Sequence, residues 1–196
     1  MRLLQTISRR VVSRVLLAAV VSLAAGRALA QEGVFLTEEQ APHAVFPDAD
    51  AFERQVVTAT PEMHERMKNT LGTAEPSVWE EQYVTFKATH AAALVGYAIV
   101  VEEIGKHRPI TFVVGVRPDG SVNDVAVMAY REAYGGEVRS KRFLNQYRGK
   151  TAKSGLQTYS DVQNIAGATL SVDAASRAVK KALAVAQITF GTGAAS

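Results

Sequence analysis

The fold is decided by the stretch ITFVVGV-RPDGS-VNDVAVMAY, which covers residues 110–130. Its two outer parts are rich in Val, Ile and aromatic residues, the side chains that favour β-strands. Between them, Arg117-Pro118-Asp119-Gly120 is typical of a tight turn, because Pro fixes one backbone angle and Gly accepts angles closed to other residues. The stretch therefore predicts two neighbouring antiparallel strands, 110–116 and 122–130.

Two earlier segments, 81–87 and 94–101, have the same strand-like composition. Because short links join all four segments, we expect an antiparallel sheet. Helical patterns follow the sheet at 140–148 and at 173–187. Together these elements predict an α+β fold, with an antiparallel β-sheet flanked by helices in a single domain.

Residues 31–77 predict a helical lead-in to the sheet. A first helical pattern begins at Thr37 and continues to Phe46. A second begins at Thr60-Pro61, because Thr is a common N-cap and Pro is favoured in the first turn, and Gly72 ends it. We expect this segment to pack on the domain or to guide its docking, without chemistry of its own.

Residues 1–30 are typical of a secretory signal peptide. An arginine-rich start precedes the apolar run 15–26, and Ala28-Leu29-Ala30 forms a cleavage site before Gln31. The apolar run is short for a membrane span. We expect a cleaved leader and a periplasmic or otherwise exported protein; an uncleaved membrane anchor is the alternative.

The leader also accounts for the basic character of the chain. The whole sequence has 22 Lys and Arg against 19 Asp and Glu, and the leader holds five Arg and no acid. Cleavage therefore changes the net charge from +3 to −2, which gives no indication of nucleic-acid binding. The absence of Cys excludes disulfides, thiolate-bound iron–sulfur clusters and a CxxCH haem site, and four scattered His predict no metal site.

One stretch that could bind a ligand is NIAGATLS, residues 164–171, just before the last helical pattern. Its small residues let the backbone approach another group closely. A hydroxyl before a helix N-terminus faces free N–H groups and the positive end of the helix dipole, which suits a phosphate. The alternative is that Thr169 or Ser171 simply caps the helix.

A second such stretch is YREAYGGEV, residues 130–138, which directly follows the last predicted strand. Paired glycines beside aromatic residues allow a flat ring to approach. The alternative is a bulged strand end followed by the start of a helix.

Both stretches resemble motifs of the FMN-binding domain family, which includes the flavin subunits of the Rnf and sodium-pumping NADH:quinone reductase complexes. Residues 166–171, AGATLS, resemble its [S/T]-G-A-T-x-[S/T] motif. Residues 132–136 resemble its E-[T/S]-P-G-[L/Y]-G segment, and residues 143–150 resemble an F-x-G-K passage between the two. The family usually has Ser or Thr in place of Ala166, and often Asp in place of Gln163. The resemblance implies an FMN-binding domain over residues 78–190.

The resemblance also implies roles for individual residues. Thr169 would carry FMN through a phosphoester that a flavin transferase installs from FAD. The neighbouring cofactor-binding positions would be Ala166, Gly167, Ala168, Leu170 and Ser171, with Ser171 as the expected helix cap. The positions packed against the flavin ring would be Glu132, Tyr134, Gly135 and Gly136.

FMN passes one or two electrons, and the sequence contains neither a second nucleotide motif nor a recognisable catalytic set. We therefore expect an exported flavoprotein that relays electrons between redox partners rather than a stand-alone catalyst. Two alternatives stay open: a flavoenzyme that holds FMN non-covalently, and an exported binding module without a redox group.

Overall fold

The computed structural model describes residues 33–193, so the predicted signal peptide lies outside the described residues. In this part of the chain, no helix has the length and apolar character needed to cross a membrane. The elements, in chain order, are α2 (Ala41–Val45), β1 (Ala51–Thr58), α3 (Pro61–Leu71), β2 (Gln82–His90), β3 (Ala93–Ile104), β4 (Pro109–Val116), β5 (Val122–Tyr130), the 3-10 turn η1 (Gly136–Arg139), α4 (Lys141–Leu144), the 3-10 turn η2 (Asn145–Tyr147) and α5 (Thr169–Phe190).

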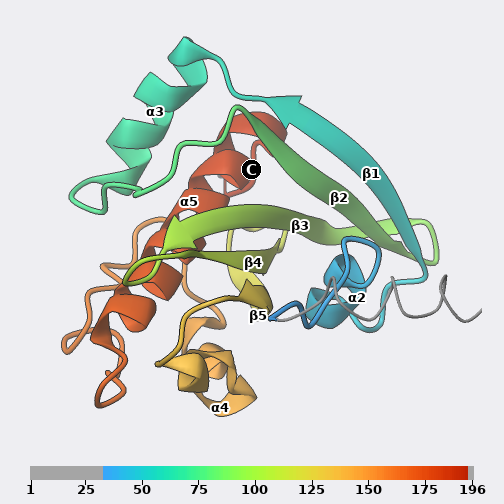
Figure 1. The fold of residues 1–196 in the computed structure, drawn as a ribbon. Helices are drawn as coiled ribbons and strands as arrows, with labels where there is room; N and C mark the ends of the chain where they lie inside the picture. The colour runs from blue at the N-terminus through green and yellow to red at the C-terminus, as the bar shows by residue number, and fades with distance from the viewer. Residues whose placement is uncertain (1–32, 194–196) are drawn as a thin grey trace, which may run out of the picture. The chain divides into compact units, whose positions relative to one another are not determined.

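The five strands form one antiparallel sheet in the order β1-β2-β3-β4-β5 (Figure 1). The four predicted strands are confirmed as β2 to β5. The predicted turn between β4 and β5 closes with a 2.9 Å bond from the Gly120 N–H to the Arg117 carbonyl. Gly120 has φ +80°, which explains why glycine stands there. The α+β prediction, a sheet flanked by helices in a single domain, is confirmed.

Strand β1 was not predicted, and the lead-in at 31–77 therefore contains a strand as well as two helices. The sequence of β1, AFERQVVT, mixes charged and apolar residues, and none of its residues is fully buried. It pairs only with β2, from Ala51 opposite Thr89 to Thr58 opposite Gln82. An exposed edge strand of this kind lacks the apolar alternation by which the other strands are recognised.

Of the two helices predicted in the lead-in, one begins at the expected residue and the other is shorter than expected. Helix α3 begins where predicted, since the Thr60 hydroxyl accepts a 3.2 Å bond from the Met63 N–H, and it ends before Gly72. The first predicted helix is shorter than expected and begins only at Ala41. Before it, Thr37 and Gln40 bond each other's backbone N–H groups in a separate turn.

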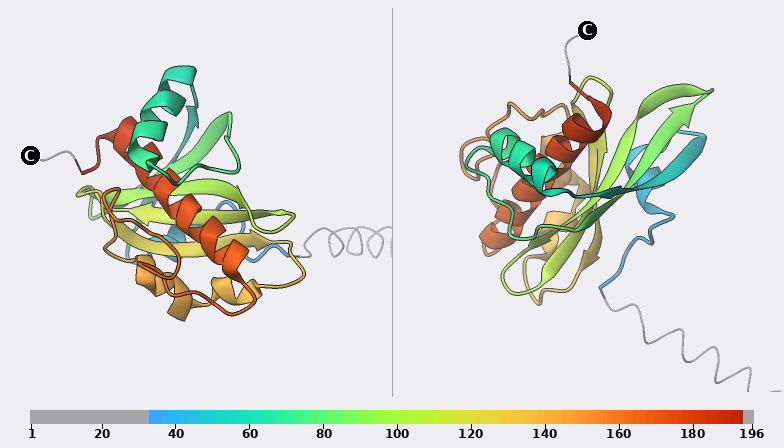
Figure 2. Two further views of the ribbon diagram at one scale, coloured as in Figure 1. Left: turned by 90° about the vertical axis from the view of Figure 1, so that its left-hand side faces the viewer. Right: turned by 90° about the horizontal axis from the view of Figure 1, so that it is seen from above.

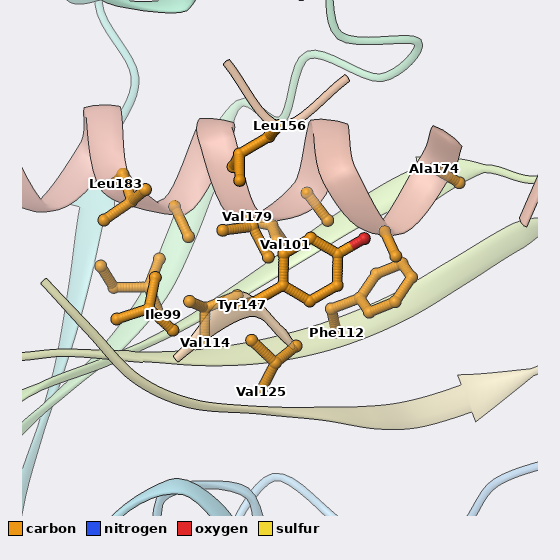
Figure 3. Packing of buried hydrophobic residues seen from close by; sticks show 14 of the residues in the cluster. Ile99, Val101, Phe112, Val114, Val125, Tyr147, Leu156, Ala174, Val179 and Leu183 are labelled. Carbon is orange, nitrogen blue, oxygen red and sulfur yellow. The ribbon is translucent and has the colours of Figure 1, made fainter. Parts of the chain in front are cut away.

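Helix α5 runs diagonally across one face of the sheet, with α3 beside its C-terminal half (Figure 2). It begins at Thr169, four residues before the predicted start at 173. Its buried side is composed largely of Ala and Val, and such small side chains allow close packing on the strands. Figure 3 shows Tyr147, from the turn η2, between Val179 of α5 and Val125 of β5. Residues 140–148, predicted as one helix, form α4 and η2 in succession.

The opposite face of the sheet is covered by α2. Neighbouring residues of β4 therefore enter different clusters: Phe112 and Val114 pack beneath α5, whereas Val113 packs beneath α2. Both faces of the central strands are thus buried. The site described next lies at the N-terminal end of α5, beyond the end of β5.

Candidate functional site

The first turn of α5 has no capping side chain. Ala168 occupies the N-cap position and Thr169 is the first helical residue. The expectation that Ser171 caps the helix is wrong, because α5 starts two residues before Ser171. The Ser171 hydroxyl is buried and bonds the Tyr130 hydroxyl. Only 4% of Ser171 is exposed. The first N–H groups of α5 are therefore left for an external acceptor.

Tyr130 ties the two predicted motifs together. Its hydroxyl bonds the Tyr134 carbonyl and also lies 3.0 Å from Ser171 Oγ, 41 positions away in the sequence. A carbonyl can only accept, so the Tyr130 hydroxyl donates to it and the Ser171 hydroxyl donates to Tyr130. Burial raises the pKa of Tyr130, which keeps this donor protonated.

Gly135 lets the loop after β5 approach the start of α5. Its φ is +85°, and an added Cβ would lie 2.8 Å from the Tyr130 hydroxyl and 2.9 Å from Ser171 Oγ. Real Cβ atoms do not come so close to other atoms. Because glycine has no side chain, the loop can contact the helix at Gly135.

These contacts leave a cavity of about 510 Å³ between the loop and the helix start. Its volume is in the range of small-molecule sites. Seven of the ten predicted site positions line it: Glu132, Tyr134, Gly167, Ala168, Thr169, Leu170 and Ser171. The other three, Ala166, Gly135 and Gly136, are not among its lining residues. Ala133, Lys106 and His107 complete the lining.

The loop that links β3 to β4 forms one wall of the cavity. The Glu132 carboxylate holds this loop, accepting the N–H groups of His107 at 2.5 Å and of Arg108 at 2.9 Å. Partial burial raises the pKa of Glu132, but the N–H donors of His107, Arg108 and Lys106 outweigh it and lower the pKa overall. Sequence reasoning missed Lys106 and His107, because no short motif connects them with the stretches that they face.

Thr169 offers its hydroxyl at the edge of this cavity. The hydroxyl accepts a 2.9 Å bond from Asn164 Nδ2 and lies 3.4 Å from the Tyr159 hydroxyl. Thr169 also lines a second cavity, of about 530 Å³, on the side of Tyr159 and Arg177. Asn164 belongs to the stretch 164–171, but no role was predicted for its side chain.

Residues 105–184 match the model of the FMN-binding domain family. The match begins in the loop that carries Lys106 and His107, and it ends within α5, so it includes both sides of the cavity. This part of the chain is an FMN-binding domain, and the chain is a flavin-binding protein whose cofactor is FMN. No curated protein matches the chain.

The residues at the cavity fit the parts of FMN. The uncapped helix start supplies N–H donors for a phosphate. Tyr134 and Leu170 are 86% and 50% exposed, so their apolar surfaces are available to a flat ring. Asn164 does not line the cavity; its amide bonds the Thr169 hydroxyl at the cavity edge, and its Oδ1 is a buried acceptor without a hydrogen-bond partner among the described residues. When bound, FMN supplies one- and two-electron transfer.

Proposed function

We propose that FMN is attached covalently to Thr169 through a phosphoester, and that the exported protein relays electrons between redox partners. The observation that carries this proposal is the Thr169 hydroxyl, which opens on the flavin-sized cavity at a helix start without a capping side chain. The helix dipole and the uncapped N–H groups would stabilise the negative charge of the phosphodiester.

Thr169 is a better acceptor than the other hydroxyl in the motif. Ser171 is almost fully buried, and its proton is engaged with Tyr130. Thr169 is only partly buried and lines two cavities. A transferase that brings FAD to the surface can therefore reach Thr169 without unfolding the helix.

The charges around the cavity agree with this assignment. Lys106 lines it and adds a positive charge that favours a phosphate, whereas the carboxylate of Glu132, which also lines it, is engaged by the N–H groups of His107 and Arg108. Tyr134 and Leu170 offer apolar surface for the ring on either side of the cavity. The partner that this proposal requires is a flavin transferase supplied with FAD.

The test is co-expression with a flavin transferase, followed by the intact mass and by flavin fluorescence of the band on a denaturing gel. We expect one FMN adduct on the wild type and none on Thr169→Ala, with both proteins folded. Ser171→Ala is the matched control and should keep the adduct. An adduct on Thr169→Ala would overturn the assignment. Flavin that binds but separates on denaturation would favour the non-covalent flavoenzyme.

Export is tested separately by N-terminal sequencing of the protein from the periplasmic fraction. The proposal expects a chain that begins at Gln31. A chain that still begins at Met1 in the membrane fraction would favour an anchor. For the relay function, the attached flavin should be reduced and reoxidised reversibly by small redox mediators, without a co-substrate being consumed.

A further inference from the structure

The Thr169 hydroxyl belongs to a group of three hydrogen-bonded side chains. Asn164 Nδ2 lies 2.9 Å from Thr169 Oγ1 and 2.8 Å from the Tyr159 hydroxyl. The Tyr159 hydroxyl in turn lies 3.4 Å from Thr169 Oγ1. The two protons of the Asn164 amide thus go to two different hydroxyl oxygens.

The loop that carries Tyr159 is held in an unusual conformation. Tyr159 has φ +72°, a region that residues other than glycine seldom occupy. The turn around it is fixed by a 2.8 Å bond from the Asp161 N–H to the Gln157 carbonyl and by a 2.9 Å bond from the Tyr159 N–H to the Val162 carbonyl. The neighbouring Thr158 hydroxyl bonds Asp173 of α5 at 2.5 Å. The loop is therefore fastened to the helix that begins at Thr169.

Resting on the proposed attachment at Thr169, we propose that Asn164 and Tyr159 are positioning residues for the acceptor hydroxyl. The Asn164 Nδ2 group is only a donor, so Thr169 Oγ1 accepts the bond between them. The hydroxyl proton of Thr169 must therefore point away from Asn164 Nδ2. This bond selects one orientation of the hydroxyl. The same donor suits the ester oxygen that forms, because that oxygen has no proton and can only accept.

The attachment step transfers the FMN half of FAD to the Thr169 hydroxyl. Thr169 Oγ forms a bond to the phosphorus of the FMN half of FAD, the bond from this phosphorus to the bridging oxygen breaks, and AMP leaves with that oxygen. The Thr169 proton passes to a base of the transferase or to solvent. During this step the Tyr159 hydroxyl accepts from Asn164, so its own proton is free for an oxygen of the phosphate.

The experiment measures the initial rate of FMN attachment by intact mass, with a purified flavin transferase, saturating FAD and varied concentrations of the chain. Asn164→Ala should lower the maximal rate by about tenfold, because the acceptor hydroxyl loses the donor that orients it. Asn164→Asp should lower it further, because a carboxylate cannot donate and repels the phosphate. Tyr159→Phe should lower it about two- to fivefold.

Matched controls are Asn145→Ala and Tyr97→Phe, whose side-chain polar atoms make no hydrogen bond within the described residues. Both should be modified at the wild-type rate. The concentration of chain at half-maximal rate should not change in Asn164→Ala, because the amide acts on the hydroxyl and not on docking. A change in this concentration alone would mean a docking role and overturn the proposal.

The outcomes separate the two proposals. If the wild type is modified and the folded Asn164 and Tyr159 variants react equally fast, the positioning role is wrong while covalent attachment stands. If the wild type is never modified, covalent attachment is wrong and the positioning role falls with it. Should Asn164→Ala fail to fold, Tyr159→Phe alone decides, since it removes one exposed hydroxyl and leaves the ring in place.

Discussion

The first turn of α5 and the turn around Lys181 lie on one helix but are built in opposite ways. At the first turn, Leu170 is half exposed and the Thr169 hydroxyl opens on cavities. At Lys181 the side chain is fully buried. Its Nζ lies within 2.9 Å of four oxygens, those of the Val78 and Glu102 carbonyls and of the Glu80 and Glu103 carboxylates.

The buried turn is part of a larger polar network. Arg177, one turn earlier on α5, donates to Glu103 Oε2 at 3.0 Å and to the Ile104 carbonyl at 2.9 Å. Glu103 also accepts the N–H and the hydroxyl of Ser77. Such buried ions stabilise a fold only in one alignment, since a shifted helix would leave them unpaired. We infer that the network fixes where α5 lies on the sheet, and thereby where Thr169 meets the cavity.

The largest effect on stability is expected for Lys181→Met, which keeps the length of the side chain and removes the charge. Glu103 would then remain buried with one oxygen deprived of its cation, so the free energy of unfolding should fall by about 3–5 kcal/mol. Lys180→Met is the matched control, because Lys180 is half-buried and makes no ion pair in the described part of the chain. Urea unfolding followed by circular dichroism measures both. A loss of less than about 1 kcal/mol would mean that the network does not hold the helix.

Gly135→Ala should have the next largest effect. Gly167→Ala is an unusually close control, because Gly135 and Gly167 have φ values of +85° and +80°, but an added Cβ at Gly167 meets no atom within 4 Å. Both variants carry the backbone penalty of a left-handed residue, about 1–2 kcal/mol. Only Gly135→Ala also crowds Tyr130 and Ser171, which should add about 1–3 kcal/mol. Equal losses in the two variants would show that the loop does not pack against the helix as described.

Tyr130→Phe removes the hydroxyl that joins the two halves of the site. The Ser171 hydroxyl would lose its acceptor, and we expect the free energy of unfolding to fall by about 1–2 kcal/mol. Tyr97→Phe serves as the control, because the Tyr97 ring stacks on Phe190 and its hydroxyl makes no bond in residues 33–193. If both losses are below about 0.5 kcal/mol, the link through Tyr130 contributes nothing measurable.

The smallest effect is expected at Glu132, and it depends on pH. Because the folded protein lowers the pKa of Glu132 below its usual 4.5, the stabilisation is present above that value and is lost as the pH falls through the folded pKa. At pH 7 the wild type should be more stable than Glu132→Gln by less than about 1 kcal/mol, since the group is partly exposed. As the pH falls below 4.5 the difference should shrink, and it should vanish once the carboxyl group is protonated in the folded protein as well. A difference that grows toward low pH would contradict the sign.

Much of the fold follows from local sequence. Strands β2 to β5 were predicted because β-branched residues recur between turn signals, and α3 was predicted from its Thr-Pro start and its Gly end. Strand β1 was not predicted, because its pairing with β2 determines its conformation more than its own residues do. The start of α5 was placed too late, because the small residues before Asp173 resemble a loop when the sheet beneath them is unknown.

At the site, the sequence alone determined the kind of chemistry. Residues 166–171 and 132–136 each pointed to FMN through their resemblance to motifs of the FMN-binding domain family, and the family match includes both. Only the tertiary structure decided how they meet. Tyr130 links the loop to the helix, the loop of Lys106 and His107 closes the cavity, and Asn164 and Tyr159 surround the Thr169 hydroxyl. These contacts join residues that are separate in sequence or unremarkable in type, so their geometry exists only after the strands and α5 have packed.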